Sequence, residues 1–276
     1  MKLKKSYTLI CVYFFFLSYG CDYVDPIDTF DPQLVIQGYL YESKSFSNVV
    51  LKQTVSDEDL LNYIYYGENN FKLISDANVS LTVDDSLFIS LIESSDKPGR
   101  YIVDPNNDTF IAKPSQRLTL ECIYNDQHLS AETIIPDSIT LDLIFPQNDI
   151  FIDSTDSVVI HINSYSANIG YFVKVEENEE LGSDVDIIDH GYSPSERYFL
   201  TTDNSVIIPK NFFRYFSIEY KITVLNLDKN LFDFYRSLTR PPFNPEPVIT
   251  HVEGGLGIFG SASKADAVVK VRKIED

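Results

Sequence analysis

Short runs of alternating apolar and polar residues recur along most of the chain, and they constrain its fold more than any other feature. Residues 79–83, Val-Ser-Leu-Thr-Val, are a clear case. Because successive side chains of a strand point to opposite faces of a sheet, a period of two predicts a strand with one buried face. Turn signals at Asp84 with Asp85 and at Asn125 with Asp126 separate neighbouring runs and predict hairpins. We therefore expect a mainly β protein.

The number and spacing of the runs predict two β-sandwich domains in tandem. Residues 33–136 hold about seven of them, as in a small immunoglobulin-like sandwich. Residues 137–276 hold a second set, which we expect to form a fibronectin-like sandwich. One helix is predicted near residues 228–239, where Asp228 can cap a segment whose apolar residues recur at helical spacing. The last strand is expected over residues 267–271.

The N-terminus has the pattern of an export signal that ends at a cysteine. Three lysines precede a short uncharged apolar stretch, and Gly20 comes directly before Cys21. This stretch is too short for a transmembrane helix, which needs about 20 apolar residues. We expect residues 1–20 to be removed as a lipoprotein signal peptide, Cys21 to carry acyl chains such as palmitate, and residues 21–32 to form an acidic tether. The alternative is an ordinary secretory signal with an incidental cysteine.

Charge and cysteine content narrow the class of protein further. The chain has 22 basic and 41 acidic residues, and residues 1–20 contain three of the basic and none of the acidic ones, so the mature chain would carry a net charge of −22. Such a charge repels nucleic acid, and we expect no nucleic-acid partner. Cys11 leaves with the signal segment and Cys21 is acylated, so only Cys122 is left, which excludes an intrachain disulfide in the mature chain. The place of Cys122 in an alternating run predicts a buried, unreactive thiol.

The chain resembles a known family at several segments. These are Cys21 with residues 34–39 (Leu-Val-Ile-Gln-Gly-Tyr), 117–124 (Arg-Leu-Thr-Leu-Glu-Cys-Ile-Tyr), 131–139 (Ala-Glu-Thr-Ile-Ile-Pro-Asp-Ser-Ile), 244–247 (Asn-Pro-Glu-Pro) and 253–260 (Glu-Gly-Gly-Leu-Gly-Ile-Phe-Gly). Together they are similar to the domain of unknown function 4249 family of Bacteroidota lipoproteins, over nearly the whole mature chain. One departure is at His251 and Val252, where the family usually has a serine-asparagine pair.

The resemblance implies a location and a class of partner. Members of the family are outer-membrane-anchored, two-domain β proteins, so the resemblance implies lipid attachment at Cys21, on the periplasmic face or at the cell surface. They tend to be encoded near TonB-dependent transporters, which implies such a transporter as a partner. No biochemical activity is implied, because none is established for the family.

Gly255, Gly257 and Gly260 match the spacing of a dinucleotide-binding motif. That motif needs a strand before it, a helix that starts within it and an acidic residue about 20 positions later. Too little of the chain follows Gly260 for a helix and a partner strand, so we expect no dinucleotide and no other cofactor. Instead, we expect Gly254, Gly255, Gly257 and Gly260 to permit a close backbone approach or a positive φ, while Phe259 fills a core.

No residue spacing predicts a catalytic or a metal site. The four histidines are far apart in sequence, and no nucleophile or phosphate-binding motif occurs. Calcium binding is conceivable at the acidic stretches 104–108 and 176–189, but a turn and a solvated hairpin tip explain them better. Asp-Ser pairs such as the one at residues 137–139 resemble bacterial O-glycosylation acceptors, although a chain rich in Asp and Ser produces such matches by chance.

These observations favour a lipid-anchored, non-catalytic binding or accessory protein of the cell envelope that works with a TonB-dependent nutrient transporter. The alternatives are a surface adhesin or structural module, and a hydrolase whose site is assembled from distant loops. The expected contact residues are Tyr63, Tyr65, Tyr66 and Phe243, because aromatic side chains on loops supply contact area at low entropic cost. Packing of the same residues against their own sandwich is the competing interpretation.

Overall fold

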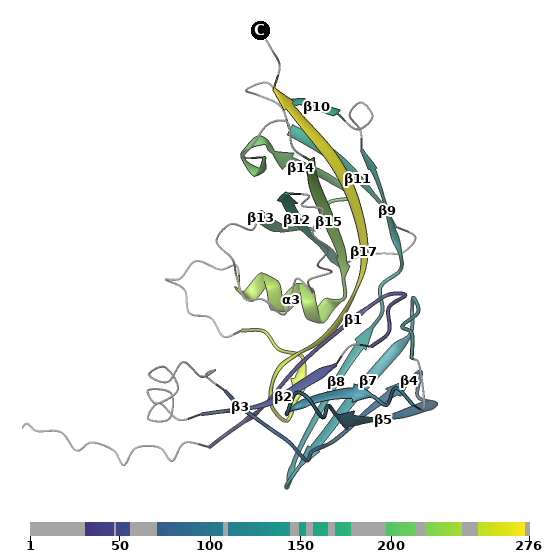
Figure 1. Ribbon diagram of the computed structural model, residues 1–276, viewed down its shortest axis with the longest axis vertical. Coiled ribbons are helices and arrows are strands. Elements are labelled where there is room, and N and C mark those ends of the chain that lie inside the picture. The colour runs from purple at the N-terminus through teal and green to yellow at the C-terminus, as the bar shows by residue number, and fades with distance from the viewer. Residues whose placement is uncertain are drawn as a thin grey trace, which may run out of the picture.

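The computed structural model is mainly β, as the sequence predicts, with an α-helix in its C-terminal region (Figure 1). It describes residues 31–46, 48–55, 71–106, 110–143, 149–152, 157–164, 169–177, 197–213, 219–238 and 248–273. The helix α3 covers Lys229–Leu238, close to the predicted range, and a short 3-10 helix, η1, covers Lys210–Phe212.

The strands follow the predicted runs. The N-terminal lobe, as we call it, consists of β1 (Leu34–Tyr41), β2 (Val49–Thr54), β3 (Phe71–Leu73), β4 (Asn78–Val83), β5 (Leu87–Glu93), β6 (Arg100–Val103), β7 (Arg117–Tyr124) and β8 (Gln127–Ile134). The C-terminal lobe consists of α3 with β9 (Ile139–Leu143), β10 (Asp149–Ile152), β11 (Ser157–Ser164), β12 (Gly170–Glu177), β13 (Arg197–Thr201), β14 (Ser205–Pro209) and β15 (Glu219–Leu227). The chain then forms β16 (Val252–Glu253) and β17 (Leu256–Lys273).

One large sheet runs through both lobes. It has 14 strands in the order β13-β12-β15-β17-β1-β2-β6-β5-β4-β7-β8-β16, with β10 beside β17 and β3 beside β2, while β14, β11 and β9 form a smaller sheet. β17 joins the lobes, because it pairs in parallel with β1 from Leu256 to Ala262 and antiparallel with β15 from Ala262 to Lys270 (Figure 1). Two separate sandwiches are therefore not confirmed. The domain boundary between residues 136 and 137 stays a prediction.

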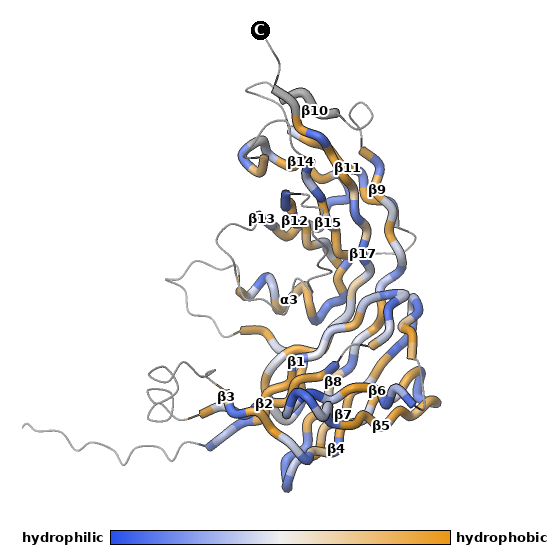
Figure 2. The backbone as a smooth tube through the Cα atoms, viewed as in Figure 1, coloured by the Kyte–Doolittle hydropathy of each residue, from blue (hydrophilic) through white to orange (hydrophobic). Residues whose placement is uncertain are grey.

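Apolar side chains gather in three clusters within the described residues. The first lies in the N-terminal lobe and includes Leu81 and Leu120, and the second lies in the C-terminal lobe and includes Ile160. The third lies between α3 and the sheet and includes Leu231 and Ile258. In Figure 2, apolar residues recur along the strands of both lobes. Burial of apolar surface, at about 25 cal/mol per Å², stabilises both lobes.

The glycine-rich segment 254–260 forms the turn after β16 and the start of β17, so the last strand begins well before residue 267. Gly254 and Gly257 have φ angles of 77° and 114°, which side chains with a Cβ rarely adopt. A Cβ at Gly254 would lie 2.0 Å from the His128 carbonyl oxygen, and one at Gly257 would lie 1.9 Å from that of Ile36. Glycine therefore lets the chain pass between β8, which pairs with β16, and β1, which pairs with β17.

Candidate functional site

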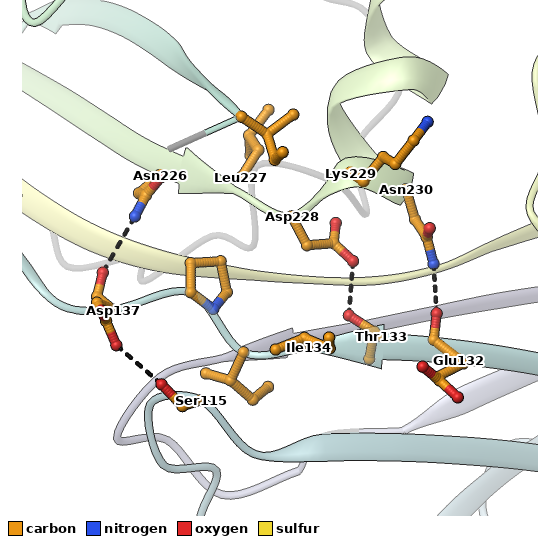
Figure 3. Close-up of a pocket in the computed structure, with 13 residues that line it drawn as sticks. Ser115, Glu132, Thr133, Ile134, Asp137, Asn226, Leu227, Asp228, Lys229 and Asn230 are labelled. Carbon is orange, nitrogen blue, oxygen red and sulfur yellow. Dashed lines mark hydrogen bonds between the residues drawn. The ribbon is translucent and has the colours of Figure 1, made fainter. Parts of the chain in front are cut away.

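A cavity of about 420 Å³ lies where the two lobes meet, beside the N-terminus of α3 (Figure 3). Its walls come from residues 132–137, at the end of β8 and just after it, and from residues 226–230, where β15 leads into α3. Ser115 and Ile169 complete the lining. Small-molecule sites usually have volumes of about 300–1,000 Å³. We call this candidate site the junction cavity.

A chain of polar side chains forms the wall of the junction cavity under α3. Thr133 Oγ1 donates to Asp228 Oδ2 at 2.6 Å and lies 2.6 Å from Ser261 Oγ. The Ser261 hydroxyl in turn donates to the Ile134 carbonyl at 2.9 Å. The other carboxylate oxygen of Asp228 accepts from the Leu231 amide at 2.8 Å, which is the N-cap that the sequence predicts. These bonds tie β8, β17 and α3 together at the edge of the cavity.

Asp228 can change its charge within the folded protein near neutral pH. It is only 7% exposed, and burial raises the pKa of its carboxyl group to about 6, against the opposing effect of hydrogen bonds from Thr133 and Leu231. A hydroxyl can either donate or accept, so Thr133 can donate to the charged carboxylate and accept from the neutral acid. In the neutral state the acid donates to Thr133, Thr133 to Ser261 and Ser261 to the Ile134 carbonyl, whereas in the charged state the Ser261 hydroxyl must turn to donate to Thr133.

Two buried asparagines hold the backbone around the cavity. Asn230 Nδ2 donates to the carbonyls of Glu132 at 2.6 Å and of Phe259 at 2.8 Å. Asn226 Nδ2 donates to the Asp137 carbonyl at 3.1 Å, but within the described part of the chain Asn226 Oδ1 has no hydrogen-bond partner. Asn226 is 1% exposed, and a buried polar atom without a partner costs about 1–3 kcal/mol. Because Asn226 lines the cavity, a donor bound there would relieve this cost once a small shift of the wall exposes Oδ1.

A second polar cluster surrounds Asp233, further along α3. Lys229 Nζ contacts Asp233 Oδ2, Arg236 Nη2 lies 2.8 Å from Oδ1, and His251 Nε2 lies 3.0 Å from Oδ2. Burial alone would raise the pKa of Asp233, but the hydrogen bonds from Lys229 and His251 and the nearby positive charges outweigh it and hold the pKa below its usual value. Of this cluster, only Lys229 also lines the cavity.

The glycine motif named from the sequence lies close to the cavity but does not line it. Gly254 and Gly255 are in the turn between β16 and β17, and Gly257, Phe259 and Gly260 are in β17. Phe259 is 1% exposed and belongs to the core of the N-terminal lobe, while Gly260 packs directly against α3. In the structure the motif therefore packs β17 against its neighbours, and β17 carries Ser261 to the hydroxyl chain.

Other residues named from the sequence have no described position. Cys21, Tyr63, Tyr65, Tyr66 and Phe243 lie outside the described residues, as do the whole signal segment and most of the tether. Lipid attachment and the aromatic contacts therefore stay predictions.

Cys122 and the acidic turn at Asp104 have local structural roles. Cys122 is fully buried in the N-terminal lobe, and burial raises the pKa of its thiol to about 12. Asp104 Oδ1 accepts from the Asn106 amide at 2.9 Å, which is a contact within a turn. In the described ranges, no three His, Cys, Asp or Glu side chains form a group that could hold a metal ion. No helix there is both long enough and apolar enough to cross a membrane.

The sequence singled out Asp228 only as a helix cap, and it did not reveal the junction cavity. One signal was present, because Asn226 interrupts an apolar run between Leu225 and Leu227. A polar residue in such a run indicates a buried hydrogen bond or a site. Thr133 and Ser261 do not interrupt an apolar run, so the sequence does not distinguish them from ordinary strand residues.

Comparison with known proteins identifies a family. No curated protein matches the chain. The model of the family described as domain of unknown function (DUF4249) matches residues 22–267. Because this match covers most of the 276 residues, the chain belongs to the DUF4249 family.

Proposed function

We propose that the protein is a non-catalytic binding or accessory module of the bacterial cell envelope and that the junction cavity is its capture site. The observation that carries this proposal is the cavity itself, which combines aliphatic walls with a buried acceptor, Asn226 Oδ1, that has no partner among the described residues. A concave, partly apolar site with a few converging polar atoms is the usual form of a ligand site. Strands and a helix hold these atoms, so the site is preformed.

The second part of the proposal is the anchor. The protein would be a Bacteroidota lipoprotein of the outer membrane, with residues 1–20 removed, acyl chains including palmitate on Cys21, and residues 21–32 as a tether. The basic start, the short apolar stretch and the cysteine support this, together with the character of the family that the sequence resembles.

The third part is the partner and the architecture. The protein would serve a TonB-dependent nutrient transporter, with Tyr63, Tyr65, Tyr66 and Phe243 as further contacts. Residues 33–136 and 137–276 would be two sandwich-like units that share β17. Separate apolar clusters in the two lobes support this division.

Native mass spectrometry of the protein purified from outer membranes tests the capture site. Ile134 lines the cavity and is 49% exposed, so Ile134→Trp should narrow the cavity without disturbing a core. Ile123, 47% exposed on β7, does not line the cavity, so Ile123→Trp is the matched control. A bound transporter or small ligand should be present with the wild type and Ile123→Trp and absent with Ile134→Trp. Equal binding by all three proteins would exclude the cavity as the capture site.

Membrane fractionation tests the anchor separately. Cys21→Ser should move the protein from the detergent phase to the aqueous phase, because the acyl chains are lost. A variant that loses its signal segment and still enters the detergent phase would show that Cys21 is not the anchor. Release of product from a peptide or glycan would contradict the non-catalytic assignment.

A further inference from the structure

We propose that the junction cavity binds a primary ammonium group carried on an aliphatic stem. This inference rests on the proposed function, in which the cavity is the capture site, and it adds the chemistry of the captured group.

The free acceptor in the cavity calls for a ligand that donates. The Asp137 carbonyl, which also accepts from Ser263 Oγ at 2.6 Å, fixes the orientation of the Asn226 amide, because only Nδ2 can face a carbonyl. Asn226 Oδ1 therefore remains as a buried acceptor in the wall of the cavity, with almost no accessible surface of its own. A ligand N–H would give this oxygen the partner that it lacks among the described residues.

The side-chain donors of the lining are directed at protein acceptors. Thr133 donates to Asp228 at 2.6 Å and Ser115 donates to Asp137 Oδ1 at 3.2 Å. Asn230 uses Nδ2 for two backbone carbonyls. A ligand that accepts from these groups would have to break an existing bond, whereas a ligand that donates would not.

Charge favours a cation over a neutral donor. Three carboxylates line the cavity, on Glu132, Asp137 and Asp228, and the one basic residue of the lining, Lys229, already contacts Asp233. Of the three, Asp228 is buried, so its charge attracts a cation more strongly than it would at an open surface. Glu132 Oε1 lies 3.5 Å from Arg117 Nε. Because both side chains are exposed, this ion pair is weak, and Glu132 can still interact with a ligand.

The N-terminus of α3 also borders the cavity and, taken alone, would favour an anion. Asp228 already occupies that place, with Oδ1 accepting from the Leu231 amide. An anionic ligand would therefore lie beside an existing carboxylate, and the helix end does not reverse the preference for a cation.

The walls of the cavity suit an aliphatic stem. Ile134 and Ile169 line it while remaining 49% and 46% exposed, and Pro136 and Leu227 add further apolar surface. A short carbon chain would cover this surface while its ammonium group reaches Asn226. A free alkylamine and a lysine side chain of a partner protein share this chemistry.

Calorimetric titration with three probes of equal stem tests the inference. The probes are n-butylammonium, n-butanol and n-butyrate, and the full mature chain is used. We expect the dissociation constant of butylammonium to be lower than those of the other two by about tenfold or more, because a hydrogen bond from a charged donor is stronger than a neutral one and the carboxylates add attraction. Tighter binding of butyrate would show an anion site at α3 and overturn the inference, and so would the absence of binding by all three.

Variants with conserved shape locate the effect. Glu132→Gln and Asp137→Asn should each weaken butylammonium binding by about threefold or more, and Ile134→Trp should abolish it. Glu121→Gln is the control, because Glu121 is an exposed carboxylate on β7 outside the cavity. If Glu121→Gln weakened butylammonium binding equally, the effect would come from the net charge of the protein and not from the cavity, which would overturn the inference.

A blocked Gly-Lys-Gly peptide distinguishes the two sources of the ammonium group. Tighter binding of the peptide than of butylammonium indicates a lysine of a partner protein, and weaker binding indicates a free amine. If Ile134→Trp prevents native capture while butylammonium does not bind the wild type, the ligand class is wrong and the proposed function stands. If butylammonium binds the cavity while Ile134→Trp leaves native capture unchanged, the proposed function fails instead.

Discussion

Asp228 and Asp233 lie on the same short stretch of chain around α3 and are 7% and 6% exposed, yet their carboxyl groups have opposite pKa shifts. Burial raises the pKa of Asp228, whose partners are a hydroxyl and backbone amides. Burial acts in the same direction on Asp233, but hydrogen bonds and charge from Lys229, His251 and Arg236 reverse the shift. Two residues of similar exposure thus have opposite shifts, because the depth of the carboxyl group and the charge of its partners together set the sign.

The difference divides α3 into two functional ends. At Asp233, three basic side chains hold a carboxylate in its charged form, and one of them, His251, links α3 to the segment before β16. At Asp228, the hydrogen-bond partners are neutral and leave the carboxyl group able to take up a proton at the edge of the junction cavity. A site that receives a ligand needs the second kind of environment, because a carboxylate already saturated by cations would attract no further charge.

The largest effect is expected from Asp228→Asn. In the folded state the carboxyl group keeps its proton up to about pH 6, compared with a value of 3.8 for the free group, so between about pH 4 and 6 the folded state binds more protons than the unfolded state. Stability contributed by Asp228 is therefore lost as pH rises through this window. Asparagine mimics the protonated form and caps helices equally well. We expect the variant to be more stable than the wild type at pH 7.5 by up to about 3 kcal/mol in urea unfolding, and equally stable near pH 4.

The control for this experiment is Asp126→Asn in the exposed turn between β7 and β8, which should leave the pH dependence unchanged. A wild type and an Asp228→Asn variant with parallel stability profiles between pH 4 and 7.5 would contradict the raised pKa.

The next largest effect is expected from Thr133→Val, which removes the hydroxyl group but keeps the shape of the side chain. Thr133 is 2% exposed and donates to Asp228 Oδ2, so the variant leaves that oxygen of the buried carboxylate without its donor, while Oδ1 keeps the Leu231 amide. We expect a loss of about 2 kcal/mol at pH 7.5 and a smaller loss at pH 5, where the carboxyl group is mostly neutral. Thr119→Val, on the half-buried surface of β7, is the control and should change stability little. An equal loss at both pH values would show that the hydroxyl does not serve the charged form.

Local features of the sequence predict α3 and most of the strands, but they do not predict how these elements pair and pack. The Asp228 cap and the alternating runs depend on neighbours in sequence, and the structure has them where they are predicted. Very short strands such as β3, β10 and β16 were not predicted, because two to four residues carry too little periodicity. The pairing of β1 with β17 was also not predicted, since register between segments far apart in sequence follows from packing and not from either segment alone.

The junction cavity could not be predicted from the sequence for the same reason. Its lining comes from Ser115, Ile169 and residues 132–137 and 226–230, which only the folded sheet brings together. The full Asp233 cluster could not be predicted either, because His251 contacts Asp233 from the segment before β16, far from α3 in sequence. Spacing on a single helix predicts only its contacts with Lys229 and Arg236.

A smaller effect of opposite sign is expected from Asp233→Asn. The folded pKa of Asp233 lies below the unfolded value, so its contribution to stability is present above the unfolded pKa and is lost as pH falls through the folded pKa. We expect the variant to be about 1 kcal/mol less stable than the wild type at pH 7.5, because the partners are partly exposed and solvent screens them. The difference should disappear in acid. A variant more stable than the wild type at pH 7.5 would place Asp233 in the same class as Asp228.

The smallest effect, and the sharpest separation of the two aspartates, is expected from salt. The side chains of Lys229, Arg236 and His251 are 65%, 53% and 31% exposed, so mobile ions can reach the Asp233 cluster. Raising the salt concentration from about 0.05 M to 1 M shortens the screening length to about 3 Å and should reduce the stability difference between wild type and Asp233→Asn by a few tenths of a kcal/mol, roughly. The difference between wild type and Asp228→Asn should change less, because desolvation is the largest cause of its shift and the charge of His251 is the smallest. Urea unfolding of the three proteins at both salt concentrations measures this directly. Equal salt dependence of the two differences would mean that Asp228 also depends on a cation, and the division of α3 into a fixed end and a responsive end would then be wrong.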